Sequence, residues 1–403
     1  MLNFKDSFSI AVSSTAPFYS IMVTAPLIIS LVGGGAPFIY LISAIPSILV
    51  CFSMQKLDNL MPSKGTVYSW NENHFLSWIS GYCLAATGII CTAGLSIFAA
   101  DAIVGENFNF RDSIVVLVSS ILLVSCCIVN IKSIKIITVV QSIGIVIQLI
   151  GMIYIVFQIV QQGNYTEPIS GGFPDWIHAI ILSIFAYWGF DAVFALTEES
   201  EKDISQKTSI ISIISLIAFF MILTYGLTVV DIDIHNTLIS ISIAVSSITA
   251  IGSTAIPTIR GVEAMAENDD MPGFLSSRKN ASIIVLSLSI LWSILAALFD
   301  GFFWDSIESI SIMVGIYFSL SCYAAYKKDK KKTHLIGLII MMMITIIVLF
   351  TMFSTDYGET SVYGVGGVGI IVIGLLTLGL LFFAIMKHTK PQVQQQLQPT
   401  ANN

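Results

Sequence analysis

The stretch FAYWGFDAVF, residues 185–194, lies within an apolar run yet carries Gly189 and, two residues later, Asp191. An ionised aspartate at the centre of a bilayer costs about 2.5–3.5 kcal/mol on insertion scales, so the default interpretation of such a residue is functional. Glycine weakens the helix at the same depth. The rest of the chain decides which function this combination serves.

Composition sets the class of protein. Of the 403 residues, 55% are hydrophobic and 11% are charged. A soluble domain is roughly 25% charged, so most of this surface faces lipid. We expect an all-α integral membrane protein. Its net charge of −7 and its short basic loop clusters exclude a nucleic-acid-binding face.

The side chains that could hold a cofactor or a metal are scattered. The five histidines form no HExxH motif, and the six cysteines fall inside apolar segments without CxxC spacing. No cofactor, metal site or disulfide is therefore expected, and an enzyme is disfavoured. A nutrient sensor built on a transporter fold, which binds without flux, stays open as an alternative.

Twelve apolar runs have roughly the 20 residues needed to cross a hydrocarbon core. They lie near 8–32, 36–54, 75–100, 113–130, 136–160, 176–197, 209–230, 238–262, 281–299, 305–326, 335–353 and 366–386. With the amino terminus inside, every one of the 18 basic residues except Arg111 falls on the inner side. Both termini are therefore predicted to be cytoplasmic, in a protein of the plasma membrane. The sequence predicts no oligomeric state.

The first span, like the sixth, is predicted to break near mid-membrane. Pro17 removes a backbone donor and follows three hydroxyl residues, Ser13, Ser14 and Thr15. Unwound backbone at this depth is tolerated where it lines a cavity and something polar satisfies it. One kink alone is more often a matter of packing. Two interruptions at matching positions of two five-span halves indicate a transporter site.

The ends of such half-helices suit a zwitterion, because amino ends present free donors and carboxyl ends present free carbonyls. An α-carboxylate is expected on the donors of the first span, near Ala16, Pro17, Phe18 and Tyr19. An α-ammonium is expected on carbonyls of the sixth span, near Ile184, Phe185 and Ala186.

Four segments resemble motifs of the amino acid/polyamine/organocation superfamily of transporters. FAYWGFDAVFALTEESEKD resembles its F-x-x-x-G-F-E…E-E motif, and MPSKGTVYSW with FLSWISGY resembles its P-x-x-G-G-x-Y loop. RGVEAMAENDDMPGFLSSRKN resembles its R-x-x-x-A-M-A-x-D-x-x-x-P-x-F segment. The first-span STAPFYSI is similar to a bacterial amino acid permease branch that has a proline there.

The resemblance covers residues 8–326 and implies two inverted five-helix repeats, with discontinuous helices 1 and 6, followed by two peripheral helices. We accordingly expect a transporter core over 1–326, peripheral helices over 327–386 and a disordered polar tail over 387–403. The resemblance also implies secondary active transport of an amino acid or related amine by alternating access.

Several residues gain expected roles from the resemblance. Phe185 matches the aromatic gate that closes over substrate, and Trp188 would line the specificity side of the pocket. Asp191 matches the acidic position of the sixth-span motif, and Arg260 is implied as a structural or gating residue. Glu198 belongs to a group of charged residues at the cytoplasmic end of span six. This group could form an inner gate of salt bridges or a solvated face of the loop, and both interpretations stay open. On spans three and ten, the residues placed within reach of the pocket are Tyr82, Cys83, Thr87 and Tyr317.

The coupled ion stays open between proton and sodium, with the proton favoured. Proton coupling needs a titratable group reached from both sides in turn. Asp191 is the candidate, because burial favours the uncharged form of a carboxyl group. A sodium site would use hydroxyls of span eight, namely Ser246, Ser247, Thr249, Ser253 and Thr254. With no second carboxylate obvious at the pocket, we predict a neutral amino acid over a polyamine or other organic cation, and leave symport and exchange both open.

Overall fold

The computed structural model describes residues 1–105, 113–162, 167–201, 203–230, 236–299, 301–353 and 367–397. Within these ranges every named element is a helix, and the only strand-like pairings are the isolated bridges Leu2 with Ser200 and Gly33 with Ile169. The all-α prediction is confirmed. Arg111, the one basic residue expected on the outer side, lies outside the described residues.

Twelve helical segments of the described part are long and apolar enough to cross a membrane, which confirms the predicted spans. Span one consists of α1 (Phe4–Ser14) and α2 (Pro17–Val32), and span six of α7 (Phe173–Ile184), η1 (Phe185–Tyr187) and η2 (Phe190–Glu199). The other ten are α3 (Ala36–Leu60), α4 (His74–Val104), α5 (Ser113–Lys132), α6 (Ile134–Gln162), α8 (Ile204–Val229), α9 (Thr237–Glu267), α10 (Arg278–Leu298), α11 (Phe302–Asp329), α12 (Lys332–Thr351) and α14 (Gly367–Leu397). A short segment, η3 (Gly273–Ser276), joins α9 to α10. The chain is a multi-pass membrane protein.

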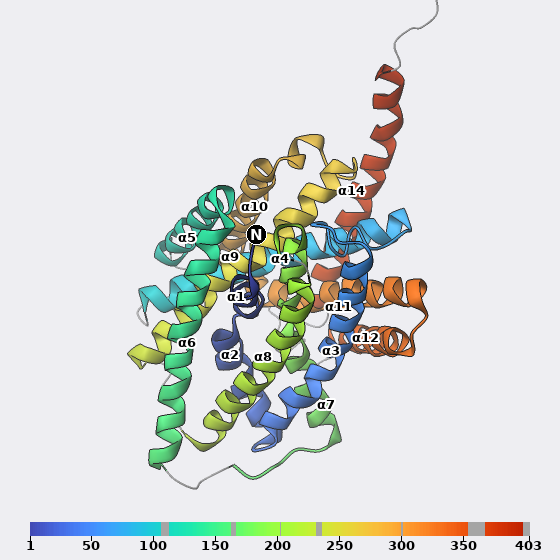
Figure 1. Ribbon diagram of the computed structural model, residues 1–403. Coiled ribbons are helices and arrows are strands. Elements are labelled where there is room, and N and C mark those ends of the chain that lie inside the picture. Colours follow the sequence, from blue (N-terminus) through green and yellow to red (C-terminus); the bar gives the residue numbers. More distant parts are fainter. Residues whose placement is uncertain are drawn as a thin grey trace, which may run out of the picture.

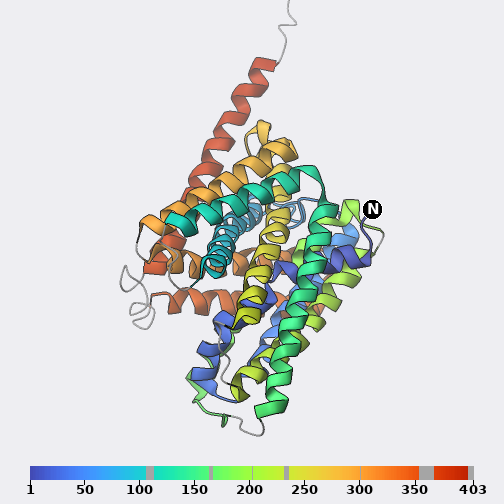
Figure 2. The same ribbon diagram turned by 90° about the vertical axis from the view of Figure 1, so that its left-hand side faces the viewer.

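The spans divide into a buried set and an exposed set. In α4 and in span six, 78% of the residues in the most apolar 18-residue stretch are buried, against 22% in α5, α6, α12 and α14. In Figure 1, α5 and α6 lie on one side of the bundle and α11 and α12 on the other. The last part of α14 projects from the bundle in both views (Figures 1 and 2) and is helical to Leu397, beyond the predicted start of the tail at 387.

The two central helices α4 and α9 pack closely because small residues let their backbones approach. A Cβ atom on Gly88 of α4 would lie 1.7 Å from Oγ1 of Thr258 on α9. Close contact of this kind makes α4 and α9 a firm scaffold beside the broken spans.

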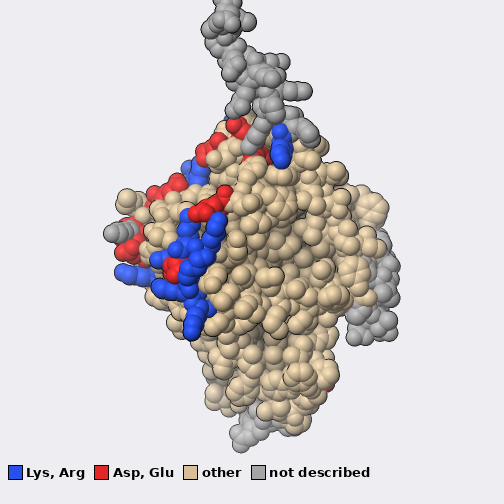
Figure 3. All heavy atoms as spheres, turned by 90° about the vertical axis from the view of Figure 1, so that its right-hand side faces the viewer, with Lys and Arg blue, Asp and Glu red and all other residues tan. Residues whose placement is uncertain are grey.

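Charged side chains cover only part of the face shown in Figure 3. In Figure 3 they gather along one edge and at the top of the molecule, and uncharged residues cover the rest of that face. The exposed residues of the outer spans are correspondingly apolar, as with Leu117, Ile153 and Ile346. Such a surface suits the hydrocarbon region of a bilayer.

Candidate functional site

Span one breaks between α1 and α2. Helix α1 ends at Ser14, and Ala16 adopts a left-handed conformation with φ 44° and ψ 57° before Pro17 opens α2. The hydroxyl of Thr15 donates to the carbonyl of Val12 at 2.8 Å, which closes the end of α1. Proline is well suited to the first position of a helix, since that N–H would have no partner within the helix. The predicted discontinuity is present at the predicted residues.

Span six breaks at Trp188 and Gly189. After α7 and the single turn of η1, Trp188 is extended (φ −63°, ψ 134°) and Gly189 has φ 118°, a conformation that favours glycine. The chain then continues as η2, whose first turn carries Asp191. The glycine thus permits the change of direction, and the acid follows directly after it.

The two breaks are in direct contact. A Cβ atom on Gly189 would lie 2.7 Å from both the carbonyl carbon and the carbonyl oxygen of Ser14. Residues 175 positions apart in the sequence therefore meet backbone to backbone, and only a residue without a side chain fits at 189.

A cavity of about 260 Å³ adjoins this contact. Because a water molecule takes up about 30 Å³ of the liquid, the cavity has room for a solute the size of an amino acid. Among its lining residues are these predicted ones: Ser14, Thr15, Ala16, Tyr19, Phe185, Ala186 and Trp188. The fold thus gathers both broken spans around one chamber, and α4 and α11 complete its wall.

Other predicted substrate residues do not line this chamber. Ser13, Pro17, Phe18, Ile184 and Gly189 belong to the breaks but are not among its lining residues. On α4, Thr87 is fully buried away from it, and the Tyr82 ring stacks on Trp78 while its hydroxyl donates to the carbonyl of Leu375 at 2.7 Å.

The backbone donors at the start of α2 have partners within the protein. The N–H of Phe18 donates to Oε1 of Gln148 at 3.4 Å, and that of Tyr19 donates to Oγ of Ser246 at 3.3 Å. The N–H of Ala16 donates to the carbonyl of Ser13 at 3.0 Å. A substrate carboxylate at the start of α2 would have to replace these acceptors, of which Gln148 and Ser246 are held by long bonds.

Asp191 is connected to the cavity by a chain of hydrogen bonds. Its Oδ2 atom accepts from the hydroxyl of Tyr317 on α11 at 3.2 Å. Nε1 of Trp188 in turn donates to the Tyr317 oxygen. Asp191 itself is 7% exposed and does not line the cavity, whereas Trp188 does. The tryptophan and the tyrosine therefore join the buried acid to the chamber.

The hydroxyls of α9 fall into two groups. Thr254 lies 3.4 Å from both Oγ and the carbonyl oxygen of Ser14, and Ser246 faces Tyr19, so both meet the break of span one. Thr249 and Ser253 instead donate to carbonyls of their own helix. Ser247 is buried, and its hydroxyl has no partner in the part of the chain that the structure describes. Only the first pair approaches the candidate site.

Ion pairs join three segments of the bundle on the side of the amino terminus. Arg260 pairs with Glu199, and Nζ of Lys64 lies 2.8 Å from Glu263 and 2.7 Å from Glu267. Burial opposes the charge on Lys64, but its hydrogen bonds to the two glutamates outweigh that effect and raise its pKa. Oε1 of Glu198 accepts from the backbone N–H of Lys64 at 3.0 Å. The predicted gate residues Arg260 and Glu198 thus take part in one network, which links the loop after α3 to η2 and α9.

Comparison with known families matches residues 2–400 to the family described as "Amino acid permease". The chain belongs to the amino acid permeases. This family lies within the superfamily that the sequence motifs indicated, and it is a family of transporters, not of enzymes. None of the curated proteins matches the chain significantly. The permease is therefore a membrane transporter of amino acids.

One charged residue of the permease's cavity was missed by the sequence prediction. Glu308, on the second turn of α11, lines the chamber together with Ile307 and Ser311. A signal was present, because Glu308 is an acid inside an apolar span, as Asp191 is. It stands only three residues from the predicted start of its span, however, and a charge so near the end of a span is expected to reach water. Its position therefore did not indicate a site.

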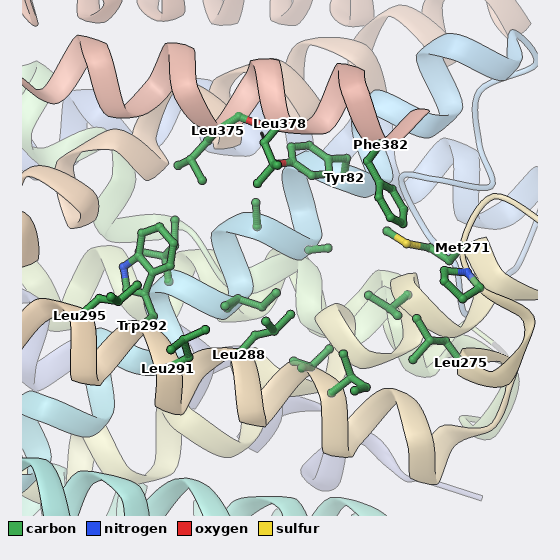
Figure 4. A pocket seen from close by; sticks show the side chains of 18 of the residues that line it. Tyr82, Met271, Leu275, Leu288, Leu291, Trp292, Leu295, Leu375, Leu378 and Phe382 are labelled. Atoms are coloured by element: carbon green, nitrogen blue, oxygen red, sulfur yellow. Dashed lines mark hydrogen bonds between the residues drawn. The ribbon is translucent and has the colours of Figure 1, made fainter. Parts of the chain in front are cut away.

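A second and larger cavity of the permease has a different character. It measures about 510 Å³ and lies between α4, α10 and α14. Figure 4 shows apolar side chains of α10, such as Leu288 and Leu291, facing Leu375 and Leu378 of α14 across it. Among the residues that the structure describes, no charged side chain lines this groove, so the smaller chamber at the broken spans suits a zwitterion better.

Proposed function

We propose that the permease is a secondary active transporter that moves an amino acid or related amine across the plasma membrane by alternating access, coupled to protons. The observation that carries this proposal is the contact between Gly189 and Ser14. It brings the interruptions of spans one and six together beside a chamber of suitable size. Interrupted helices at mid-membrane are tolerated where they line such a site.

Alternating access is supported by a difference between the two ends of the helix bundle, since one end holds a cavity and the other holds ion pairs. Apart from the break of span one itself, the cavity is lined mainly by α2, the second half of α4, the first half of span six and the early part of α11, on the side away from the amino terminus. The ion pairs of Lys64 and Arg260 close the opposite side. Since basic loops stay in the cytoplasm, we place both termini there and take the present conformation as outward-facing.

The same proposal includes the internal organisation of the chain. Residues 1–326 would form the core, as two inverted five-helix repeats, and residues 327–386 the peripheral helices. The equivalent breaks in the opening helices of the two halves support this division.

Proton coupling is supported by the link from Trp188 through Tyr317 to Asp191. A change in the protonation of Asp191 would alter the bond that Tyr317 donates, and with it the position of the tryptophan on the cavity wall. The sodium alternative would use Ser14, Thr254 and neighbouring carbonyls. The prediction of a neutral substrate rested on Asp191 being the only carboxylate at the pocket, and Glu308 removes that premise.

The test is uptake into vesicles that contain the purified permease, with imposed proton or sodium gradients. We expect a proton gradient to drive uptake, and Asp191→Asn to remove most of its dependence on pH between about pH 5 and 8. An unchanged pH profile in Asp191→Asn would exclude this residue as the coupling group. Binding without any uptake would instead favour the sensor.

A matched control is Glu72→Gln. Glu72 lies in the loop before α4, where hydrogen bonds from Lys328 and Lys327 lower its pKa to about 2. It therefore stays ionised throughout the assay range, and its replacement is expected to leave the pH profile of uptake unchanged.

A further inference from the structure

Glu308 presents a carboxylate that none of the described residues neutralises. Its Oε2 atom is buried and has no hydrogen-bond partner among the described residues, although its side chain lines the cavity. The backbone carbonyl of Glu308 accepts from Ser311 at 2.7 Å, but that bond does not involve the carboxylate. A buried carboxylate oxygen without a donor is unfavourable unless a bound group supplies one.

No lysine or arginine whose side chain is described lies on the cavity side of the bundle. On α11 itself the first lysine is Lys327, 19 residues later and so about 28 Å along the helix. The remaining basic residues stand at span ends on the side of the amino terminus: Lys5, Lys56, Lys64, Lys132, Lys135, Lys207, Arg260, Arg278, Lys279, Lys328, Lys330, Lys331, Lys332 and Lys387. Within the described chain, Glu308 therefore has no intramolecular cation.

The chamber is lined mainly by apolar side chains, with a few hydroxyl side chains such as Ser20 and Thr24 among them. Leu95 of α4 and Ile307 of α11 line it, and Ser14 and Ala16 line the end at the break. A substrate side chain with an aliphatic stem and a charge at its tip would match both the apolar lining and the carboxylate of Glu308. Its methylene groups would pack on the apolar surface, and its charged head would take the polar partner.

We propose that Glu308 binds a second positively charged group of the substrate, so that the permease selects an amino acid with a basic side chain. The inference rests on the proposed function, because it takes the chamber at the breaks as the substrate site. The α-ammonium and α-carboxylate bind at the broken helices, and the ammonium at the tip of the side chain binds Glu308. A diamine shares this chemistry except for the carboxylate.

The test compares lysine with norleucine, which has the same aliphatic stem and lacks the terminal amine. Binding is measured by the thermal stabilisation of purified full-length permease, and transport by uptake into vesicles. Because charge-assisted hydrogen bonds are the strong ones, we expect lysine to bind at least tenfold more tightly than norleucine. Glu308→Gln is expected to weaken lysine binding about 10- to 100-fold and norleucine binding less than about threefold.

The control variant is Glu72→Gln, the same substitution at an exposed glutamate that is not among the cavity-lining residues. It is expected to keep the preference for lysine. Glu308→Asp, which retains the carboxylate, is expected to restore part of the preference. Tighter binding of 1,5-diaminopentane than of lysine would also support the role of Glu308 and would assign the substrate to the diamines.

Two results would overturn the inference and leave the proposed function standing. One is equal binding of lysine and norleucine to the unmodified permease, a comparison that needs no variant to fold. The other is an equal loss of both ligands in Glu308→Gln, which would place the α-ammonium on Glu308. If none of the common amino acids binds or crosses the membrane, the proposed function fails as well.

Discussion

Replacing Gly189 by alanine tests whether the contact between the two breaks creates the binding site. The new Cβ atom would lie 2.7 Å from the carbonyl carbon and oxygen of Ser14, a separation at which the two backbones must move apart. The φ angle of 118° also disfavours any residue with a side chain. The substitution therefore acts on conformation and on packing together.

The two costs can be estimated separately. Holding an alanine in a left-handed conformation costs roughly 1–2 kcal/mol. Forcing an extra methyl group into a packed region typically costs about 1–3 kcal/mol. Gly189→Ala is thus expected to lower the free energy of unfolding by roughly 2–5 kcal/mol. For a chain of this size, at roughly 2 °C per kcal/mol, the melting temperature would fall by about 4–10 °C.

The structure offers a control for each cost. Gly105 has φ 92°, but a Cβ atom added there would have no heavy atom of the described residues within 4 Å, so we expect Gly105→Ala to add the conformational cost alone. A Cβ atom on Gly374, inside α14, would have no neighbour within 4 Å in the described part of the chain, and Gly374 needs no positive φ, so Gly374→Ala is expected to be harmless. The assay is the melting temperature of each purified variant, with the affinity for its best amino acid ligand.

Of the three variants, we expect only Gly189→Ala to lose affinity for the ligand. The loss should be about tenfold or more, because about 1.4 kcal/mol of binding free energy corresponds to a tenfold change. A Gly189→Ala variant that melts and binds as Gly105→Ala does would contradict this expectation. Such a result would mean that the breaks can separate without cost, and that the chamber does not depend on their contact.

Two further predictions concern the scaffold and the closed end. Gly88→Ala should destabilise the permease by about 1–3 kcal/mol, since its Cβ would meet Oγ1 of Thr258 at 1.7 Å. Adding Thr258→Ala should recover at least half of the lost melting temperature, and purely additive losses in the double variant would contradict the contact. Lys64→Met removes the ion pairs to Glu263 and Glu267. The accessibility of the cavity is reported by Ser14→Cys in an otherwise cysteine-free chain. A thiol reagent applied on the side of the amino terminus should label this cysteine about 2- to 30-fold faster when Lys64→Met is present. Lys279→Met, at an exposed lysine of α10, should have no such effect, and equal labelling rates in the two variants would show that this network is not a gate.

Much of the fold was predictable because it depends on short stretches of chain. Each span needs only a run of apolar residues as long as the bilayer is thick, and this local condition placed all twelve. The breaks are local as well. Pro17 lacks an N–H wherever it stands, and glycine at 189 permits a φ of 118° that other residues resist. The sequence therefore indicated the span-six break and its buried acid without knowledge of any neighbour.

The tertiary structure alone decided which side chains meet at those breaks. Tyr317 reaches Asp191, and Glu308 enters the cavity, while Tyr82 of α4 turns towards α14. In a soluble protein an apolar stripe would show which face of each helix is buried. Here most helices are apolar on all faces because they also contact lipid. The sequence therefore does not show how each helix is rotated about its own axis. That rotation is set by close contacts between distant segments, such as Gly88 with Thr258 and Gly189 with Ser14, and these exist only once the chain has folded.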